Sequence, residues 1–526
     1  MHVVTLLFVI PVFTTLIFCQ YCAKRLFTMI TFEEYQAFKN RGFSHAPLVK
    51  KRLMDAQTPV SVFSKVRDLS GSAYLFESVV GGERWARYSM IGLGSDLILQ
   101  YADGNMTIKK DDHIDINAVD EPFDYIRKLM AGYKMPTSDD VEALPSFSGG
   151  LVGYFGYDMV RVIEPSVGLS DAPNPMSLPD MWLMLSMSVI VFDNLENTLS
   201  IIVYADCNDE EGYGTAIREL EKIEDKLAEM PNLSAPIMPT PKFVSQTGQE
   251  KYCADVNKIK DYILAGDVMQ VVPAQRLTAD YKGDSLAVYR ALRFLNPSPY
   301  LFLVHGYTLD DHKRFDIIGA SPEILSRIEN GKVTVRPLAG TRKRGQDEAE
   351  DLALEKELLS DKKEIAEHLM LIDLGRNDIG RVCEYGSVKV TEKMFIERYS
   401  QVMHIASNVE GTILPDKDAL DVFCATFPAG TLSGAPKIRA MQIIDEVEPV
   451  RRTVFGGSVG YLGWHGNMDT AIAIRTAVMR RGKIHIQAGA GVVADSVPEA
   501  EWDETNKKAL ALVKAVKMAC DGLRIR

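Results

Sequence analysis

Apolar residues in the first half of the chain fall into short runs separated by turn residues. The segment Ser188–Asp206 has two runs rich in Val, Ile and Tyr on either side of Asn194–Asn197, which predicts a β-hairpin. The segment Phe147–Arg161 combines aromatic residues with closely spaced glycines. That pattern is typical of a strand that other backbone segments approach closely.

Helical periodicity is clearest in the second half. The segment Glu250–Asp267 is amphipathic and reaches Gly266, which predicts a helix that ends there. The following segment, Val268–Tyr281, is typical of a strand. Two further helices are predicted over Asp361–Leu374 and Pro498–Leu512. We find no repeat of 20–50 residues and no glycine fingerprint for a nucleotide.

A proline-rich stretch divides the chain. Residues 231–244 contain Pro231, Pro236, Pro239 and Pro241, a spacing that interrupts helices and strands alike. We therefore interpret 231–244 as a linker between an N-terminal domain, 29–230, and a C-terminal domain, 245–526.

Residues 1–28 differ from the rest of the chain. The run Val3–Cys19 is apolar and uncharged, and it contains Pro11. A mis-called start, a membrane anchor and a weak signal peptide are all compatible with this run. We favour the first, because Met29 opens a stretch in which Thr31 and Glu34 have the spacing of a helix capping box.

Composition narrows the class of protein. The chain has 46% hydrophobic and 25% charged residues and a net charge of −12, values of a globular protein. No block of Lys and Arg is present, which argues against a nucleic-acid partner. The seven cysteines are scattered and odd in number. They indicate a reducing compartment and hence the cytoplasm.

Two pairs of glutamates with helical spacing are candidates for a metal site. Glu364 and Glu367 form one pair, and Glu501 and Glu504 form the other. Each pair alone is more typical of a solvated helix face, where like charges cost about 0.2–0.5 kcal/mol. If the two helices face each other, the four carboxylates suit Mg²⁺. Zinc is disfavoured because no Cys or His cluster lies nearby in the sequence.

Other segments suggest an anionic ligand. The stretches Pro337–Gly345, Pro428–Lys437 and Gln487–Ser496 are rich in small and hydroxyl residues, whose backbone N–H groups could approach a carboxylate. Arg475 interrupts an apolar strand, where a buried guanidinium needs an anion, either the carboxylate of a small molecule or an internal Glu. His404 also lies among apolar residues, and such a histidine is more often structural than catalytic.

Seven motifs occur together and in order: GASPEILSR, PLAGTRKRG, EHLMLIDLGRND, VMHIASNVEG, TFPAGTLSGAPK, AIAIRTAVM and QAGAGVVADSVPEAEWDET. In this combination the chain resembles the chorismate-utilising enzymes, and within them the large-subunit (component I) family of anthranilate synthases. The resemblance covers residues 29–526. It implies an α+β fold of two packed β-sheets flanked by helices, and a need for Mg²⁺.

The resemblance also implies site residues. Glu367 and Glu504 would be the closest Mg²⁺ ligands, with Glu364 and Glu501 completing the set. The backbone at Gly489, Ala490 and Gly491 would share the ring carboxylate of chorismate with the ion. The other carboxylate would be held by Arg475, Gly340 and Thr341.

Further positions are implied to act on the ring. Glu323 would be the general acid that protonates the departing hydroxyl. His404 and Thr431 would line the ring, and His404 would assist the loss of pyruvate. Phe455 stands where a Tyr is common in the family, so a phenol contact to substrate is lost or replaced.

Two positions indicate the nucleophile. Family members that use water carry a Lys where this chain has Gln270, and a glutamine cannot act as a base. Aminodeoxychorismate synthases commonly carry a Lys where this chain has Ala339. Ammonia is therefore the expected nucleophile and anthranilate the expected product. Aminodeoxychorismate synthase component I is the alternative enzyme, and a membrane-tethered sensor of aromatic ligands is the non-enzyme alternative.

The resemblance also has consequences for the source of ammonia and for feedback regulation. None of the cysteines has the glycine-flanked setting of an amidotransferase nucleophile. The resemblance therefore implies a separate glutamine amidotransferase subunit, in a heterotetramer of two large and two small subunits. It also implies a feedback site for L-tryptophan in the N-terminal part. Its candidate residues are Glu77, Ser78, Pro299, Tyr300 and Leu301, the last standing where Met is common.

Overall fold

The computed structural model describes residues 30–78, 87–119, 121–141, 144–399 and 402–525. The apolar run before Met29 and the interpretation of Met29 as the start lie outside these residues. Within the described part of the chain, no helix is both long and apolar enough to cross a membrane.

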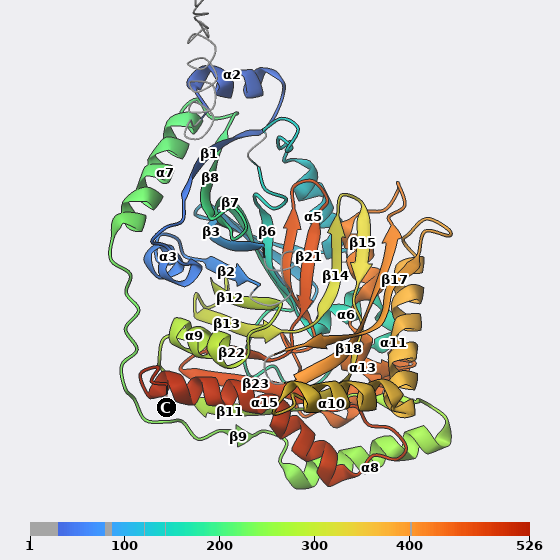
Figure 1. Cartoon of the computed structure of the whole chain (residues 1–526). Coiled ribbons are helices and arrows are strands. Elements are labelled where there is room, and N and C mark those ends of the chain that lie inside the picture. Colours follow the sequence, from blue (N-terminus) through green and yellow to red (C-terminus); the bar gives the residue numbers. More distant parts are fainter. Residues whose placement is uncertain (1–29, 79–86, 120, 142–143, 400–401, 526) are drawn as a thin grey trace, which may run out of the picture.

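The strands form two antiparallel layers (Figure 1). The first layer, in hydrogen-bonded order, is β9 (Val244–Ser245), β11 (Ala274–Asp280), β23 (Lys483–Gly489), β22 (Thr476–Arg480), β13 (Arg314–Ser321), β12 (Tyr300–Tyr307), β2 (Ala73–Glu77), β3 (Tyr88–Ala102), β7 (Met181–Asp193), β8 (Thr198–Asp206) and β1 (His45–Leu53).

The second layer begins at an exposed edge strand and also passes through β3 and β7. Its order is β5 (His113–Ala118), β4 (Asn105–Lys110), β3, β7, β6 (Gly150–Phe155), β20 (Ser458–Gly463), β21 (Met468–Ile472), β14 (Ile324–Glu329), β15 (Lys332–Val335) and β18 (Val402–Thr412). Both β16 (Leu338–Lys343) and β17 (Lys389–Arg398) pair with β18.

The long strands β3 and β7 belong to both layers. Their pairing shifts register between Leu93 and Ile98, and such irregularities bend a strand pair. On one side of the shift the pair is flanked by β2 and β8, and on the other by β4 and β6. The expected α+β fold with two packed sheets is confirmed, but the two sheets are continuous through these strands.

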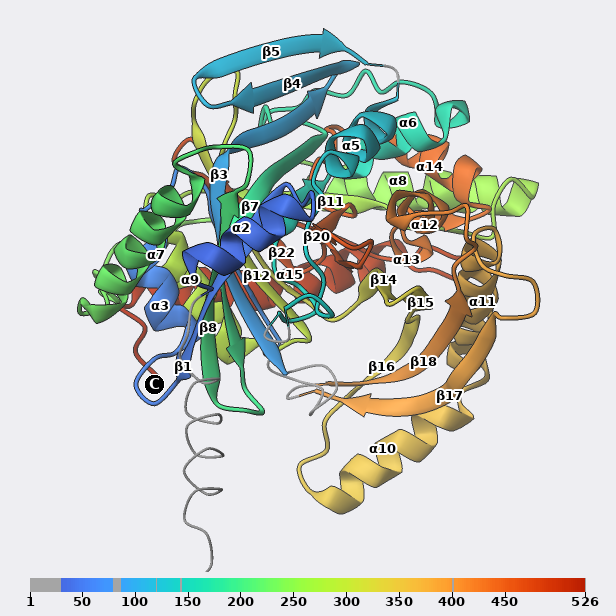
Figure 2. The same cartoon turned by 90° about the horizontal axis from the view of Figure 1, so that it is seen from above.

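The three largest apolar clusters lie on the faces of the sheets, one between the two sheets and one on each outer face. The core between the sheets includes Tyr154 of β6, Trp182 of β7 and Phe315 of β13, and the rings of Tyr154 and Phe315 meet edge to face at 6.0 Å. The outer face of the first sheet is covered by α2 (Phe32–Asn40), α3 (Pro59–Val66), α7 (Gly212–Ala228), α9 (Ser285–Leu295) and α15 (Pro498–Cys520) (Figure 2).

The outer face of the second sheet carries a different set of helices. They are α5 (Pro122–Ala131), α6 (Val160–Ile163), α11 (Lys362–Gly380), α12 (Ala419–Thr426), α13 (Gly430–Ser433) and α14 (Lys437–Val447). The remaining elements are α8 (Gln249–Ala265), α10 (Glu348–Ser360), the 3-10 turns Tyr157–Met159 and Pro165–Val167, and the short pair β10 (Gln270–Val271) and β19 (Gly434–Ala435).

Most predicted local elements are confirmed. The hairpin of β7 and β8 turns at Asn194–Asn197, α8 ends at Gly266 in the left-handed conformation, and Thr31 with Glu34 forms a capping box. Close backbone approach at β6 is also confirmed, because a Cβ on Gly153 would lie 2.1 Å from the carbonyl oxygen of Trp182.

Three boundaries were wrong. Helix α11 runs on to Gly380 and α15 to Cys520. The strand predicted over Val268–Tyr281 is split into β10 and β11 around Pro273, because proline has no N–H to donate to a ladder.

The proline-rich segment has no helix or strand from residue 231 to 243. It joins α7 to β9 along the outside of the molecule (Figure 1). The two parts it connects do not have separate cores, because β2 pairs with β12 and β6 pairs with β20. The assignment of regulation to 29–230 and of catalysis to 245–526 stays a prediction.

Candidate active site

Glu323 lies in the short connection between β13 and β14, and its side chain is buried, with 8% of the residue exposed. The hydroxyl of Thr431, on α13, donates to both carboxylate oxygens at 3.3 and 3.4 Å. Burial raises the pKa of Glu323 to about 8, while the Thr431 hydroxyl and the charges of Arg475 and Lys508 act in the opposite direction. A carboxyl with this pKa is protonated at neutral pH and can act as a general acid.

His404 lies on β18, and its ring contacts Gly340 and Thr341 of β16. Its Nδ1 lies 3.0 Å from the Gly340 carbonyl oxygen and 3.1 Å from the Thr341 hydroxyl. A carbonyl only accepts, so Nδ1 carries the hydrogen and Nε2 is left as an acceptor. Nε2 is buried without a partner among the described residues. Burial, with a smaller contribution from Arg475, lowers the pKa of His404 to about 4, so the ring is neutral.

Arg475 does not lie within a strand, so the prediction that it interrupts an apolar strand was wrong. It occupies the connection between β21 and β22 with φ of 48°, a conformation that is uncommon for a non-glycine residue. Its charge acts on Glu323 and on Tyr399. The structure shows no hydrogen bond from this guanidinium to any described residue, so it is available to an anionic ligand.

The two glutamate pairs lie on α11 and α15, and charges on each helix act on carboxylates of the other. Burial raises the pKa of Glu367, and the neighbouring Glu364 raises it further. Burial also raises the pKa of Glu501, with a contribution from Glu504. The charge of Lys363 is felt by both Glu367 and Glu501, which places the two helices within electrostatic reach of each other.

The four carboxylates do not form a closed cluster. Glu364 lies 3.4 Å from Arg342, and Glu504 lies 2.8 Å from Lys508. In the described part of the chain no three His, Cys, Asp or Glu side chains are close enough to hold an ion together. The donor set nevertheless fits Mg²⁺, because all donors are carboxylate oxygens and burial raises the pKa of two of them, Glu367 and Glu501.

Lys508 is a site residue that sequence reasoning missed. Its Nζ donates to the Gly489 carbonyl at 3.0 Å, and its charge is felt by Glu323, His404 and Glu367. Helical spacing from Glu501 and Glu504 could have revealed it, because positions i, i+3 and i+7 share one face.

The glycine-rich segment after β23 lies beside Gln270. A Cβ on Gly491 would lie 2.6 Å from Nε2 of Gln270, and the Gln270 amide in turn hydrogen-bonds Glu367. Of the three backbone groups predicted to meet a carboxylate, the Ala490 N–H is already used, since it donates to the Pro273 carbonyl at 3.2 Å.

Phe455 lies in the apolar interior. It is 6% exposed and belongs to the same apolar cluster as Leu432. The guanidinium carbon of Arg452 lies 5.6 Å from the centre of its ring.

Two small cavities open around these groups. One, of about 60 Å³, is lined by Glu323 and Thr431, and the other, of about 270 Å³, is lined by Gln270. Both are bordered by Leu371, Leu374 and Gly430. They are smaller than most ligand pockets, which measure about 300–1,000 Å³.

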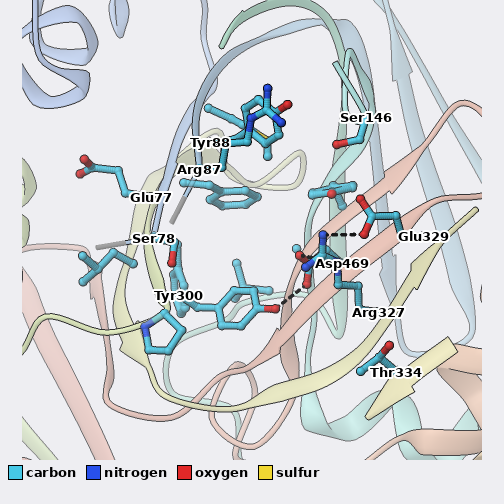
Figure 3. Close-up of a pocket in the computed structure, with 18 of the residues that line it drawn as sticks. Glu77, Ser78, Arg87, Tyr88, Ser146, Tyr300, Arg327, Glu329, Thr334 and Asp469 are labelled. Carbon is cyan, nitrogen blue, oxygen red and sulfur yellow. Dashed lines mark hydrogen bonds and ion pairs between the residues drawn. The ribbon is translucent and has the colours of Figure 1, made fainter. Parts of the chain in front are cut away.

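A larger cavity, of about 460 Å³, lies between the two sheets and is lined by all five residues proposed for tryptophan (Figure 3). Glu77 is turned away from it: its carboxylate accepts hydrogen bonds from Tyr289 at 2.5 Å and Arg293 at 3.1 Å, both on α9. The expectation that Glu77 contacts the ligand is therefore unsupported, and its side chain anchors the cavity wall instead.

Beyond the five predicted residues, the cavity is lined by polar groups that the sequence did not suggest, including Asp469, Arg327 and Glu329. Tyr300 donates to Asp469 at 2.8 Å, and Arg327 donates to Glu329 at 3.0 Å. Arg87 and Tyr88 face them across the cavity (Figure 3). Such a pocket, with aromatic and charged walls, suits a zwitterionic ligand with an apolar body. In the sequence, these lining residues could have been recognised from the alternation of polar and apolar positions along β14 and β21.

The sequence matches the profile of chorismate binding enzymes over residues 84–514. The chain belongs to the chorismate binding enzyme family. It is 57% identical to anthranilate synthase component 1 of Acinetobacter calcoaceticus, over 94% of this chain and 100% of that protein. It is 50% identical to anthranilate synthase component 1 of Pseudomonas aeruginosa, over 93% of this chain and 98% of that protein.

A solved member of the same family has a similar structure. Anthranilate synthase component I from Streptococcus pneumoniae superposes with a TM-score of 0.71 at 34% identity, covering 88% of this chain and 99% of that chain. The matched region of the chorismate binding family includes both the site at Glu323 and the greater part of the cavity between the sheets.

Proposed function

We propose that this chain is an anthranilate synthase large subunit, which converts chorismate and ammonia to anthranilate and pyruvate, the first committed step of tryptophan biosynthesis. The observation that carries the proposal is that a buried, protonated Glu323 and a neutral His404 both lie within electrostatic reach of Arg475 and Lys508. Gln270 stands where a water-activating lysine would be needed. The names of relatives at 46–57% identity agree with this function.

The residues divide the reaction between them. Arg475 binds the enolpyruvyl carboxylate, helped by Thr341 and the backbone at Gly340. Glu323 gives its proton to the ring hydroxyl, which leaves as water while ammonia adds to the ring carbon beside the carboxylate. Nε2 of His404 then stands ready for the ring proton that is lost as pyruvate leaves.

Lys508 complements this arrangement. Its ammonium lies between the Gly489 carbonyl and Glu504, where it can neutralise part of the acidic face on α15. Its charge also opposes the burial that raises the pKa of Glu323. An anionic substrate is thereby attracted to a site that would otherwise repel it.

A magnesium ion belongs to the proposal. Glu367 and Glu504 would hold it directly, with Glu364 and Glu501 completing the set. Bound there, Mg²⁺ would neutralise and orient the ring carboxylate of chorismate. With the ion bound, the contacts of Arg342 with Glu364 and of Lys508 with Glu504 would weaken.

Ammonia would come from a partner. The relatives are named as component 1, which implies a second component, and we propose a glutamine amidotransferase in a heterotetramer of two large and two small subunits. The cytoplasm is the proposed location, from the scattered cysteines. No nucleic acid is involved.

Regulation by L-tryptophan is proposed at the cavity between the sheets. Ser78, Pro299, Tyr300 and Leu301 would contact the inhibitor, with Glu77 as the anchor described above. The cavity volume of about 460 Å³ is sufficient for one amino acid.

One experiment separates the candidates. The purified chain is incubated with chorismate, Mg²⁺ and ammonium, and the aromatic product is identified by mass spectrometry. We expect anthranilate and pyruvate in equal amounts. Formation of 4-amino-4-deoxychorismate would indicate aminodeoxychorismate synthase component I, and absence of turnover with retained tryptophan binding would indicate a sensor.

A further inference from the structure

Arg452 is among the largest fully buried side chains of the protein, with 2% of the residue exposed. It follows α14 in the chain, and its guanidinium reaches Leu432 on α13 and Val272 after β10. A guanidinium is rarely buried unless its charge and all its donors are satisfied. The partners of Arg452 therefore show which parts of the fold depend on it.

Two of those partners are backbone carbonyls next to site residues. Nη1 donates to the Leu432 carbonyl at 2.7 Å, and Nη2 donates to the Val272 carbonyl at 2.6 Å. Leu432 directly follows Thr431, the hydrogen-bond donor to Glu323. Val272 follows β10, the strand that carries Gln270. A single planar group thus joins the two segments at fixed distance.

The other side of the guanidinium is held by Glu448. Nε of Arg452 lies 3.1 and 3.0 Å from the two Glu448 oxygens, and Glu448 also accepts from the Ala274 backbone N–H at 2.8 Å. Glu448 itself is only 8% exposed. The bidentate pair fixes the plane of the guanidinium, which a lysine could not reproduce.

Aromatic rings sandwich the same group. The guanidinium carbon lies 4.7 Å from the ring centre of Tyr157 and 5.6 Å from that of Phe455. The next residue, Thr453, has φ of 55°, and a β-branched residue with positive φ persists only where its surroundings over-determine it. The backbone around Arg452 is therefore held as firmly as its side chain.

We propose that Arg452 is a positioning residue, which orients Thr431 and Gln270 by clamping the segments that carry them. The effect on catalysis rests on the function proposed above. Because misplacement of reacting groups by about 1 Å can cost roughly 100-fold in rate, loss of this clamp should lower kcat well before it lowers substrate affinity.

The test uses Arg452→Lys, which keeps the charge opposite Glu448 but cannot supply all the bonds. Arg480→Lys is the matched control: Arg480 is also buried, at 4% exposure, but it pairs with Thr308 and Asp311, away from the candidate active site. Glu448→Gln is a milder second variant, because the glutamine keeps an acceptor for the Ala274 N–H while loosening the guanidinium.

Hydrogen–deuterium exchange tests the clamp without any turnover. In Arg452→Lys, and less so in Glu448→Gln, we expect faster exchange in peptides that cover Thr431–Gly434 and Gln270–Pro273. We expect no change there in Arg480→Lys. Equal exchange in wild type and Arg452→Lys would overturn the proposal, whatever reaction the protein catalyses.

Kinetics with ammonium as nitrogen donor test the catalytic consequence. We expect kcat to fall about 10- to 100-fold in Arg452→Lys, with a much smaller change in KM for chorismate. In a Thr431→Val background the same substitution should cost far less, because its effect passes through Thr431. Additive losses, or a loss equal to that of Arg480→Lys, would show a purely structural role. A failure of wild type to form anthranilate would instead count against the proposed function, and the exchange result would still decide the clamp.

Discussion

The polar groups of the cavity between the sheets are hydrogen-bonded to one another, whereas several polar groups of the candidate active site are buried without a full set of partners. In the cavity, Tyr300 is bonded to Asp469 and Arg327 to Glu329. In the active site, Nε2 of His404 has no partner among the described residues, and the pKa values of Glu323 and Glu367 are raised by burial.

The cause of the difference is the scaffold. The cavity is walled by strands of both sheets, whose ladders already fix its volume of about 460 Å³. The active site lies where α11, α13 and α15 meet loops, and the cavity at Glu323 has only about 60 Å³. A binding pocket can be complete before its ligand arrives, whereas a catalytic site keeps unsatisfied groups for its substrate.

The comparison predicts its largest effect at Glu323. Glu323→Gln removes the proton donor but keeps the shape of the side chain, so kcat should fall by about 10²- to 10⁴-fold. Tryptophan affinity, measured by calorimetry, should be unchanged because the cavity does not depend on this group. Turnover near the wild-type level would remove Glu323 from the proposed mechanism.

The next effect is expected at the proposed Mg²⁺ site. Glu367→Gln should lower Mg²⁺-dependent turnover, though by less than Glu323→Gln does, and weaken Mg²⁺ binding in calorimetry, because it removes one of four proposed ligand charges. The metal-free protein should become slightly more stable, by about 0.2–0.5 kcal/mol, since a repelling pair of like charges is relieved. Unaltered Mg²⁺ affinity would contradict the ligand assignment.

A smaller change is expected in the cavity between the sheets. Ser78→Ala removes one hydrogen bond to a charged ligand group, which is worth about 1.5–3 kcal/mol. The tryptophan concentration for half inhibition should therefore rise by roughly one to two orders of magnitude, with uninhibited turnover intact. If this variant keeps wild-type sensitivity, tryptophan acts elsewhere.

The smallest effect, per unit of pH, concerns the stability of the folded protein. The pKa of Glu323 is raised to about 8 by burial, so the folded state holds a proton that the unfolded chain releases above its ordinary pKa. Stability from this group is complete at low pH and declines as pH rises from about 4.5 towards 8. The decline is at most about 1.4 kcal/mol per pH unit.

Glu323→Gln provides the comparison for this last effect. The variant lacks the titrating group, so its unfolding free energy should fall less steeply with pH than that of wild type over the same range. Parallel curves in denaturant titrations would show that Glu323 is ionised in the folded protein, and it could then not serve as a general acid at neutral pH.

The sequence by itself was sufficient to predict several local structural features. The capping box at Thr31, the end of α8 at Gly266 and the hairpin of β7 and β8 follow from interactions between residues a few positions apart. The motifs around Glu323, Glu367 and Glu504 identified the family for a similar reason, since each motif is a contiguous string of residues.

Only the tertiary structure decided what these groups do together. Lys508 joins the site because α15 packs against β23, and Arg475 lies in a turn because β21 ends at Ile472. Glu77 turns away because Tyr289 and Arg293 of α9 capture its carboxylate, and Arg452 unites Leu432 with Val272. Such contacts link residues far apart in the chain. They depend on which strands pair and on how the sheets bend at β3 and β7. Periodicity and capping are local patterns, so they do not specify either of these features.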